Sequence, residues 1–188
     1  MKIKTRDMIL VSLFSALMAV GAIFKVPLPS VPFSLQPFFC ALAGLLLGSR
    51  LGALSQIIYC ALGLAGLPVF TQGGGFSYIF NPSFGYIIGF IAGTYVIGKV
   101  SEVLKKINLR NSIISVMSGL AVIYMIGVPY MYLIINFYNK KPMTMLAAIS
   151  VGFFPFIFKD IVMYLLVSVI AVRIVPVLRK AGLARANC

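Results

Sequence analysis

Histidine and tryptophan are absent from this 188-residue chain, and only three of its residues are acidic: Asp7, Glu102 and Asp160. The chain therefore lacks the groups that most general acid–base catalysis and most metal sites use. The three cysteines are widely separated, a spacing that indicates neither a disulfide framework nor a cluster of ligands. We predict that the protein is not an enzyme and that it has no metal site and no cofactor.

Charged residues of either sign are also scarce, because 61% of the residues are hydrophobic and only 10% are charged, with a mean hydropathy of +1.07. A soluble domain carries about 25% charged residues. The formal net charge of +13 would suggest nucleic acid in a soluble chain, but here the charges lie between apolar segments, as the positive-inside bias of membrane proteins predicts. The composition predicts an all-α integral membrane protein, with residues 1–188 as one membrane domain in the lipid bilayer and no nucleic-acid partner.

Six membrane-spanning helices are predicted from the apolar segments and the breaks between them. Residues 8–24 form the first, which is retained because no small-residue cleavage site of a signal peptide follows it. Residues 38–47 and 51–64 flank a Gly-Ser-Arg turn, so we expect them to form a tight helical hairpin. The remaining predicted helices lie at residues 84–103, 112–138 and 155–177, with a short extra helix between 144 and the Phe-Phe-Pro break at 153–155.

Two uncharged loops and one charged connector separate these helices. One loop is residues 26–37, whose four prolines keep the chain extended, and the other is residues 65–82. Most basic residues fall on one side if the leader, Arg50, the connector 99–110 and the tail all face the cytoplasm. This arrangement requires an even number of spans, so we expect both termini in the cytoplasm, both uncharged loops at the outer face, and a location in a bacterial plasma membrane.

Lys159 and Asp160 are ionisable residues near the start of the sixth predicted span, where a charge without a partner costs several kcal/mol. Neighbouring residues on a helix do not face one another, so we expect these two to bind a ligand. A carboxylate accepts hydrogen bonds from N–H groups, and an ammonium group donates them to oxygen atoms. A structural ion pair, or a Lys159 that reaches the membrane interface by snorkelling, is the alternative.

Asn81, Gln36 and Tyr86 are further candidates for binding a polar ligand. Asn81 precedes a proline at an expected helix start, so an N-cap is its alternative role. Gly74 is the middle one of three consecutive glycines, whose exposed amides would help to bind a polar ring, although the run lacks the Gly-Lys-Ser/Thr of a P-loop. For Gln36 and Tyr86, packing or a place at the interface is the alternative.

The first predicted helix carries small residues four positions apart, Ser12 with Ala16 and Ser15 with Ala19. Such pairs allow another helix to approach closely. We expect this small-residue stripe either to bind a partner protein or to pack inside the bundle, and the sequence does not decide between the two.

Four segments form a combined signature. They are VPFSLQ at 31–36, LAGLLLGSRLGAL at 42–54, GLAGLPVF at 63–70 and NPSFGY at 81–86. Together they resemble the BioY family, the biotin-specific substrate-binding (S) components of energy-coupling factor (ECF) transporters. The resemblance is dense over residues 31–90, weakens through the fifth predicted helix and returns around Pro155 and Asp160.

This resemblance implies a six-helix fold that binds biotin with high affinity at the outer face and delivers it inward. It also implies a transmembrane T component and two cytoplasmic ATPase subunits as partners. The residues suit the ligand: Asp160 and Asn81 match the ureido edge of biotin, aromatic side chains match its bicyclic body, and Lys159 or backbone amides match the remaining oxygen atoms.

The last helix departs from the family pattern, which usually has Pro-Gly-Asp-x-x-Lys there, and one departure matters for the ligand. Here Met163 stands where the lysine is expected. Lys159 lies four residues earlier and therefore on the same helix face, so we expect it to supply the positive charge from one turn away.

A stand-alone secondary transporter of small molecules is the alternative function. Such a transporter needs a relay for protons or sodium ions, and the chain has a single acidic residue within the membrane. The two halves of the chain also show no internal repeat. The chain has no nucleotide-binding motif, so ATP would be hydrolysed by partners. A membrane enzyme would need a nucleophile with a base, or a metal cluster, and the sequence shows neither.

Overall fold

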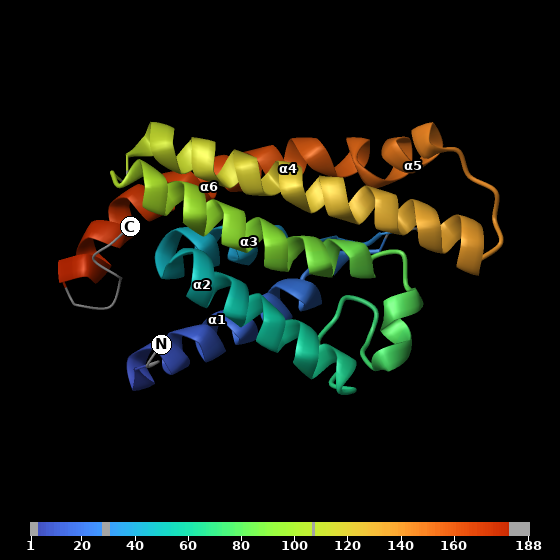
Figure 1. Cartoon of the computed structure of the whole chain (residues 1–188), viewed down its shortest axis with the longest axis horizontal. Coiled ribbons are helices and arrows are strands. Elements are labelled where there is room, and N and C mark those ends of the chain that lie inside the picture. The colour runs from blue at the N-terminus through green and yellow to red at the C-terminus, as the bar shows by residue number, and fades with distance from the viewer. Residues whose placement is uncertain (1–3, 28–30, 107, 181–188) are drawn as a thin grey trace.

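The computed structural model describes residues 4–27, 31–106 and 108–180, and these residues are almost entirely helical. The elements in chain order are α1 (Thr5–Ile23), β1 (Lys25–Val26), β2 (Phe33–Ser34), α2 (Gln36–Leu64), the 3-10 helix η1 (Phe76–Phe80), α3 (Phe84–Leu104), α4 (Leu109–Leu133), the π-helical turn η2 (Ile134–Tyr138), α5 (Met145–Gly152) and α6 (Phe154–Lys180). The described part of α1 begins, and that of α6 ends, at the same end of the molecule (Figure 1).

Five helical segments in the described part of the chain are long and apolar enough to cross a membrane. They are Thr5–Ile23, Gln36–Leu64, Phe84–Leu104, Leu109–Tyr138 and Phe154–Leu178. The sequence predicted six spans, and the difference arises in α2, where two predicted helices form one element.

A reversal at Gly48 divides α2, because the φ of 78° and ψ of −176° at this residue are far from helical values. A Cβ added at Gly52 would lie 3.1 Å from the carbonyl oxygen of Ala43. In a continuous helix these two residues would be separated by a rise of about 13.5 Å. The two halves of α2 therefore fold back on each other at the predicted turn, and the positive φ explains why glycine occupies position 48.

The helix α3 lies between α2 and α4 (Figure 1) and contacts the reversal closely. A Cβ at Gly98 would lie 2.2 Å from the backbone nitrogen of Ser49, so a larger residue does not fit there. One turn later, Glu102 accepts hydrogen bonds from the backbone N–H and from the hydroxyl of Ser49, both at 2.8 Å. Glu102 thus caps the start of the second half of α2, where N–H groups have no partner within the helix.

The charged segment 99–110 was predicted to be a water-exposed connector, but most of it is helical. The helix α3 continues to Leu104 and α4 begins at Leu109, which leaves only 105–108 as the link, and position 107 lies outside the described residues. Ser101 is buried, and Glu102 is engaged with Ser49. Part of the expected connector therefore packs into the bundle.

The helices α1, α4, α5 and α6 lie close to their predicted positions. The helix α4 continues through Pro129, and the short α5 is followed directly by α6, as expected. The helix α1 begins at Thr5, three residues earlier than predicted, with Asp7 in its first turn, where a negative charge is favourable. Residues 1–3 and 181–188, which hold part of the basic leader and tail, lie outside the described residues.

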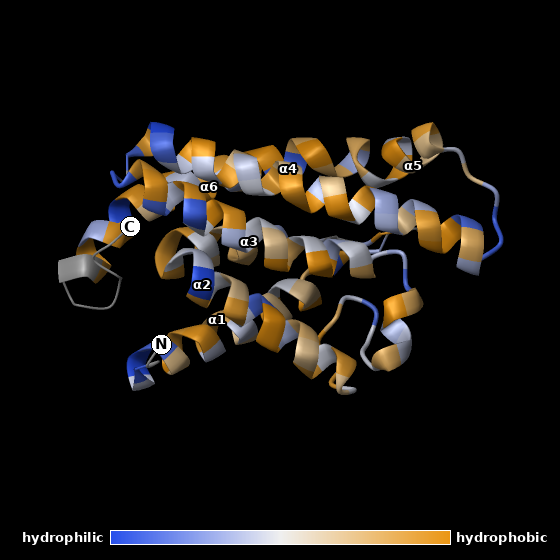
Figure 2. Cartoon of the chain, viewed as in Figure 1, coloured by the Kyte–Doolittle hydropathy of each residue, from blue (hydrophilic) through white to orange (hydrophobic). Residues whose placement is uncertain are grey.

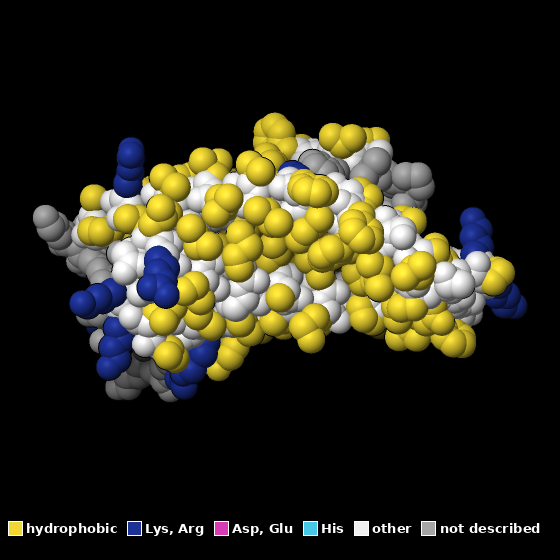
Figure 3. Space-filling view, turned by 90° about the horizontal axis from the view of Figure 1, so that it is seen from above, with side chains coloured by type: hydrophobic (Ala, Val, Ile, Leu, Met, Phe, Trp, Pro, Cys, Tyr) yellow, Lys and Arg dark blue, Asp and Glu magenta, His cyan; other side chains and the backbone are white. Residues whose placement is uncertain are grey.

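Apolar residues predominate along the helices, and hydrophilic residues gather toward the ends of the bundle (Figure 2). On the face drawn in Figure 3, most of the visible Lys and Arg side chains lie at the two ends, with the larger group at the end where α1 begins. Helices with apolar sides and basic ends are typical of a multi-pass membrane protein.

We expect Glu102→Ala to lower the thermal unfolding midpoint of the detergent-solubilised protein. The variant removes the acceptor that caps the second half of α2, a loss of about 1–2 kcal/mol. Glu102→Gln keeps one carbonyl oxygen as acceptor and should retain most of the stability. Lys99→Ala, which changes an exposed charge on the same helix, is the control. Equal midpoints for Glu102→Ala and Lys99→Ala would contradict the capping role.

Candidate functional site

A cavity lies among α2, α3, α4 and α6 and the segments that join α1 to α2 and α2 to α3. Four of the site residues predicted from the sequence line it: Gln36, Tyr86, Lys159 and Asp160. The structure therefore brings residues from three distant parts of the chain to one place.

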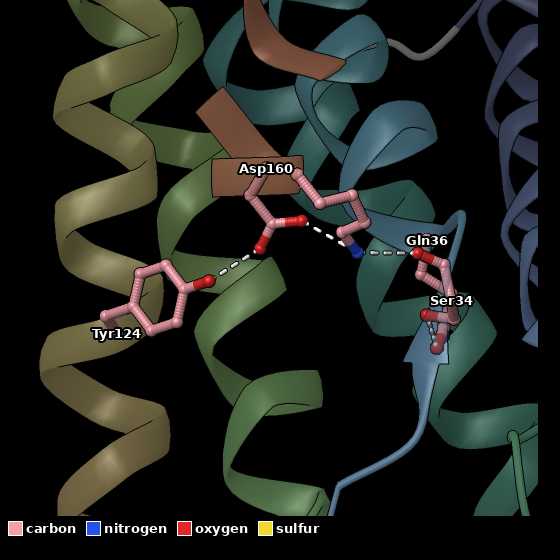
Figure 4. Close-up of polar contacts among 5 residues, drawn as sticks. Ser34, Gln36, Tyr124 and Asp160 are labelled. Carbon is pink, nitrogen blue, oxygen red and sulfur yellow. Dashed lines mark hydrogen bonds and ion pairs between the residues drawn. The ribbon is translucent and has the colours of Figure 1, made fainter. Parts of the chain in front are cut away.

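Asp160 is the buried charge of this cavity, with only 5% of its surface exposed. Its Oδ2 accepts a hydrogen bond of 2.7 Å from the hydroxyl of Tyr124 on α4, and its Oδ1 lies 2.8 Å from the ammonium group of Lys159 (Figure 4). A buried carboxylate is tolerated when it is both paired and hydrogen-bonded. The contacts of Asp160 meet this requirement within the protein.

The ion pair corrects one step of the sequence analysis, which expected Lys159 and Asp160 not to face each other. The lysine side chain is long enough to curl back to the neighbouring carboxylate, so the spacing rule, which concerns Cβ positions, does not prevent contact. The ammonium group also donates a hydrogen bond of 3.0 Å to the carbonyl oxygen of Ser34 in β2. Lys159 thus connects α6 to the segment between α1 and α2.

Gln36 and Tyr86 line the cavity, and both are held by protein groups. The amide of Gln36 donates to the hydroxyl of Tyr59 at 2.7 Å, and its carbonyl oxygen accepts from the hydroxyl of Ser34 at 3.1 Å. The hydroxyl of Tyr86 donates to the carbonyl oxygen of Gly152 at 2.7 Å. These bonds fix the orientation of both side chains at the cavity wall.

Two loop segments close one side of the cavity. The strands β1 and β2 form a small antiparallel hairpin, and Lys25 in β1 donates a hydrogen bond to the backbone carbonyl of Thr71, which lines the cavity. The loop that carries Thr71 is fixed by Phe70, whose ring would lie 2.0 Å from a Cβ at Gly63. Lys25, directly before the predicted loop 26–37, therefore contacts the predicted loop 65–82 beside the cavity.

Asn81 and Gly74 do not line this cavity. Asn81 follows η1, where its amide donates to the side chain of Gln72 and its carbonyl oxygen accepts from the backbone N–H of Ser83 at 2.9 Å. Ser83, not Asn81, is the N-cap of α3 and reaches the cavity. Gly74 packs against the backbone of Leu67, where a Cβ would come within 2.0 Å of the carbonyl oxygen.

The sequence analysis missed several polar residues of the cavity. They are Ser34, Thr71, Ser83, Tyr124 and Tyr164. Tyr124 and Tyr164 lie in long apolar helices, where a tyrosine is indistinguishable from a packing residue. Tyr164 did carry one signal, because it follows Asp160 by four positions and so shares its helix face.

The small-residue stripe of α1 is divided between two environments. Ser15 is buried, and its hydroxyl donates to the backbone carbonyl of Ser55 in α2 at 2.7 Å. Ala19 is half-buried and packs against the core. Ser12 and Ala16 are exposed. Ser15 and Ala19 therefore correspond to the alternative of packing inside the bundle, and only Ser12 and Ala16 remain accessible to a partner.

The family assignment follows from the extent of the similarity. A family model described as BioY family matches residues 1–180. The chain belongs to the BioY family. It is 41% identical to a probable biotin transporter BioY of Lysinibacillus sphaericus, over 94% of this chain and 90% of that relative. It is also 39% identical to the biotin transporter BioY of Thermotoga maritima, over 90% of this chain and 95% of that relative.

A solved structure has the same fold. It is described as the S-component for biotin from an ECF-type ABC transporter, determined by crystallography. It matches with a TM-score of 0.77 and 27% sequence identity, covering 93% of this chain and 90% of that chain. This similarity extends over most of the chain, and the BioY family model covers α6 with Lys159 and Asp160.

We expect Tyr124→Phe to lower the unfolding midpoint of the ligand-free protein in detergent. The variant leaves a buried carboxylate without one charge-assisted hydrogen bond, which is worth about 1.5–3 kcal/mol. Tyr132→Phe, on the same helix but outside the cavity lining, is the matched control. A Tyr124→Phe variant as stable as Tyr132→Phe would show that Asp160 does not depend on this hydroxyl.

Proposed function

We propose that this chain is the biotin-binding membrane subunit of an ECF transporter, which captures biotin at the outer face and delivers it inward. The observation that carries the proposal is the buried carboxylate of Asp160 in a cavity whose other walls are mostly apolar or hydroxyl-bearing. The relatives named as biotin transporters, and the similar structure described as a biotin S-component, support it.

The cavity offers biotin the contacts that its chemistry requires. The ureido ring of biotin carries two N–H donors, for which the Asp160 carboxylate is the matching acceptor. Its bicyclic body is apolar and suits the side chains of Phe90, Ile123 and Phe156, which line the same cavity. A ligand of this kind needs a few polar groups for orientation and a larger apolar surface for affinity.

We infer that Lys159 supplies the positive charge of the site in place of a lysine at position 163. Lys159 lines the cavity, whereas Met163 is half-buried and packs against the hydrophobic core. Asn81 and Gly74 take an indirect part in this proposal: Asn81 orients Ser83, and Gly74 lets the loop pack closely.

The same proposal includes six membrane spans and two cytoplasmic termini. The reversal at Gly48 supports two spans within residues 36–64, each shorter than the roughly 20 residues of a lipid-exposed helix. Such short spans need protein around them, and 67% of the residues in the apolar stretch of α2 are buried. The basic residues at the end where α1 begins support a cytoplasmic location of that end.

Energy for uptake would come from partners, a transmembrane T component and two ATPase subunits. In this proposal the chain itself is a transport component and not an enzyme. The exposed pair Ser12 and Ala16 on α1 is the proposed contact with the T component, because helices associate in lipid by close van der Waals contact at small residues.

We expect Asp160→Asn to weaken biotin binding to the purified protein by about tenfold to a hundredfold, since a charge-assisted hydrogen bond contributes about 1.5–3 kcal/mol. Equilibrium titration with labelled biotin measures the effect. Asp7→Asn is the control, because Asp7 is also a buried carboxylate but lies in the first turn of α1, outside the cavity lining. An equal loss in both variants would point to folding, and the absence of saturable binding by the unmodified protein would refute the proposed function.

We expect Ala16→Leu to leave biotin binding unchanged and to abolish ATP-driven uptake by the reconstituted complex. A bulky side chain at a small position keeps the partner helix at a distance. Ala61→Leu, at an exposed position of α2, is the matched control. Co-purification of the T component with the Ala16→Leu variant would contradict the proposed contact, and uptake by the chain without any ATPase would favour a secondary transporter.

A further inference from the structure

Tyr164 on α6 is completely buried, and it lines the cavity. Its hydroxyl has no nitrogen or oxygen atom as hydrogen-bond partner among the described residues. The neighbouring Cys40 thiol is a weak hydrogen-bonding group, and its sulfur already lies 2.9 Å from the hydroxyl of Thr94. Buried hydroxyl groups in native proteins almost always have a partner, so this one requires an explanation.

The other hydroxyl groups of the described cavity lining are all engaged by the protein. Tyr124 donates to Asp160, and Tyr86 donates to the carbonyl oxygen of Gly152. The hydroxyls of Ser34, Thr71 and Ser83 bond to neighbouring side chains. Among the hydroxyl groups of the described lining, that of Tyr164 is therefore the one that the cavity keeps available for a ligand.

Asp160 and Tyr164 are separated by four residues on α6, so their side chains project from the same helix face, with Cβ atoms about 5–6 Å apart. One of them offers a hydrogen-bond acceptor and the other a donor. The complement of this pair is a ligand edge on which an N–H group stands next to a carbonyl oxygen. A cyclic urea or a lactam has such an edge.

We propose that Tyr164 donates its phenolic hydrogen to the carbonyl oxygen of the ligand's ureido ring while Asp160 accepts a hydrogen bond from the adjacent N–H. This inference rests on the proposed function and assigns to Tyr164 the recognition of one ligand atom. In this arrangement the ammonium group of Lys159 keeps its contacts with the Asp160 carboxylate and the Ser34 carbonyl.

The test compares three ligands on the purified protein and on Tyr164→Phe, by competition with labelled biotin at neutral pH. Biotin and dethiobiotin both carry the ureido carbonyl, whereas 2-iminobiotin replaces it with a protonated imine that accepts no hydrogen bond. We expect Tyr164→Phe to weaken biotin and dethiobiotin about tenfold, as for one buried neutral hydrogen bond, and to change 2-iminobiotin little.

Three results would overturn the inference. They are unchanged biotin affinity in Tyr164→Phe, an equal loss for all three ligands, and a loss for biotin that spares dethiobiotin, which would assign the hydroxyl to the ring sulfur. If the unmodified protein binds no biotin, the proposed function fails first, and this result is distinct from the other three.

A second measurement separates ligand recognition from a structural role. Tyr164→Phe removes a hydroxyl without an oxygen or nitrogen partner, so the ligand-free variant should unfold at the same temperature as the unmodified protein or at a higher one. Tyr59→Phe is the matched comparison, because the hydroxyl of this buried tyrosine donates to the carbonyl oxygen of Val69 and accepts from Gln36, and its loss should lower the midpoint. A decrease in Tyr164→Phe as large as in Tyr59→Phe would overturn the inference.

Discussion

The buried carboxylate of Asp160 is the group on which the arrangement of the cavity depends. Inside a membrane protein, a carboxylate that loses its partners is strongly destabilising, so each partner must be held in position. Tyr124 comes from α4, Lys159 from α6, and Lys159 in turn contacts Ser34 in β2. One charge therefore fixes the relative positions of two helices and of the hairpin beside the cavity.

Close backbone contacts make these bonds geometrically possible. A Cβ at Gly89 of α3 would lie 2.9 Å from the carbonyl oxygen of Ile123 in α4, the residue before Tyr124. On the other side of α3, Gly98 leaves no space between the helix and the reversal of α2. Because apolar side chains gain little from leaving lipid, such contacts are the main source of helix association in a bilayer. The glycines of α3 thus place the Tyr124 hydroxyl within reach of α6.

The features that could be predicted from the sequence are those set by local composition. The long apolar helices, the turn at Gly48, the break between α5 and α6 and the position of Asp160 all depend on residues close together in the chain. The partners of Asp160 could not be predicted, because they depend on which side of each helix faces inward. In α1 and α2 almost every position is apolar or small, so hydrophobic periodicity carries no information about rotation. This explains why Ser15 could not be distinguished from Ser12.

Long-range contacts also explain the remaining differences. Glu102 belongs to a charged segment and gave no sign that it caps a helix start 53 residues earlier in the chain. The place of Asn81 depends on how residues 65–82 fold against α2, which is determined by the packing of Phe70 on Gly63 and not by the local sequence. Each of these positions is decided by tertiary contacts that a single sequence does not display.

The helix α1 connects the two regions that a transport subunit has to coordinate. Its bond from Ser15 to Ser55 holds one face against α2, and Ser12 and Ala16 lie beside that face at exposed positions. At its other end α1 leads, after Phe24 alone, into β1, where Lys25 bonds to the carbonyl of Thr71 beside the cavity. The hairpin is held beside the cavity by two lysines, because Lys25 bonds to the carbonyl of Thr71 and Lys159 bonds to the carbonyl of Ser34.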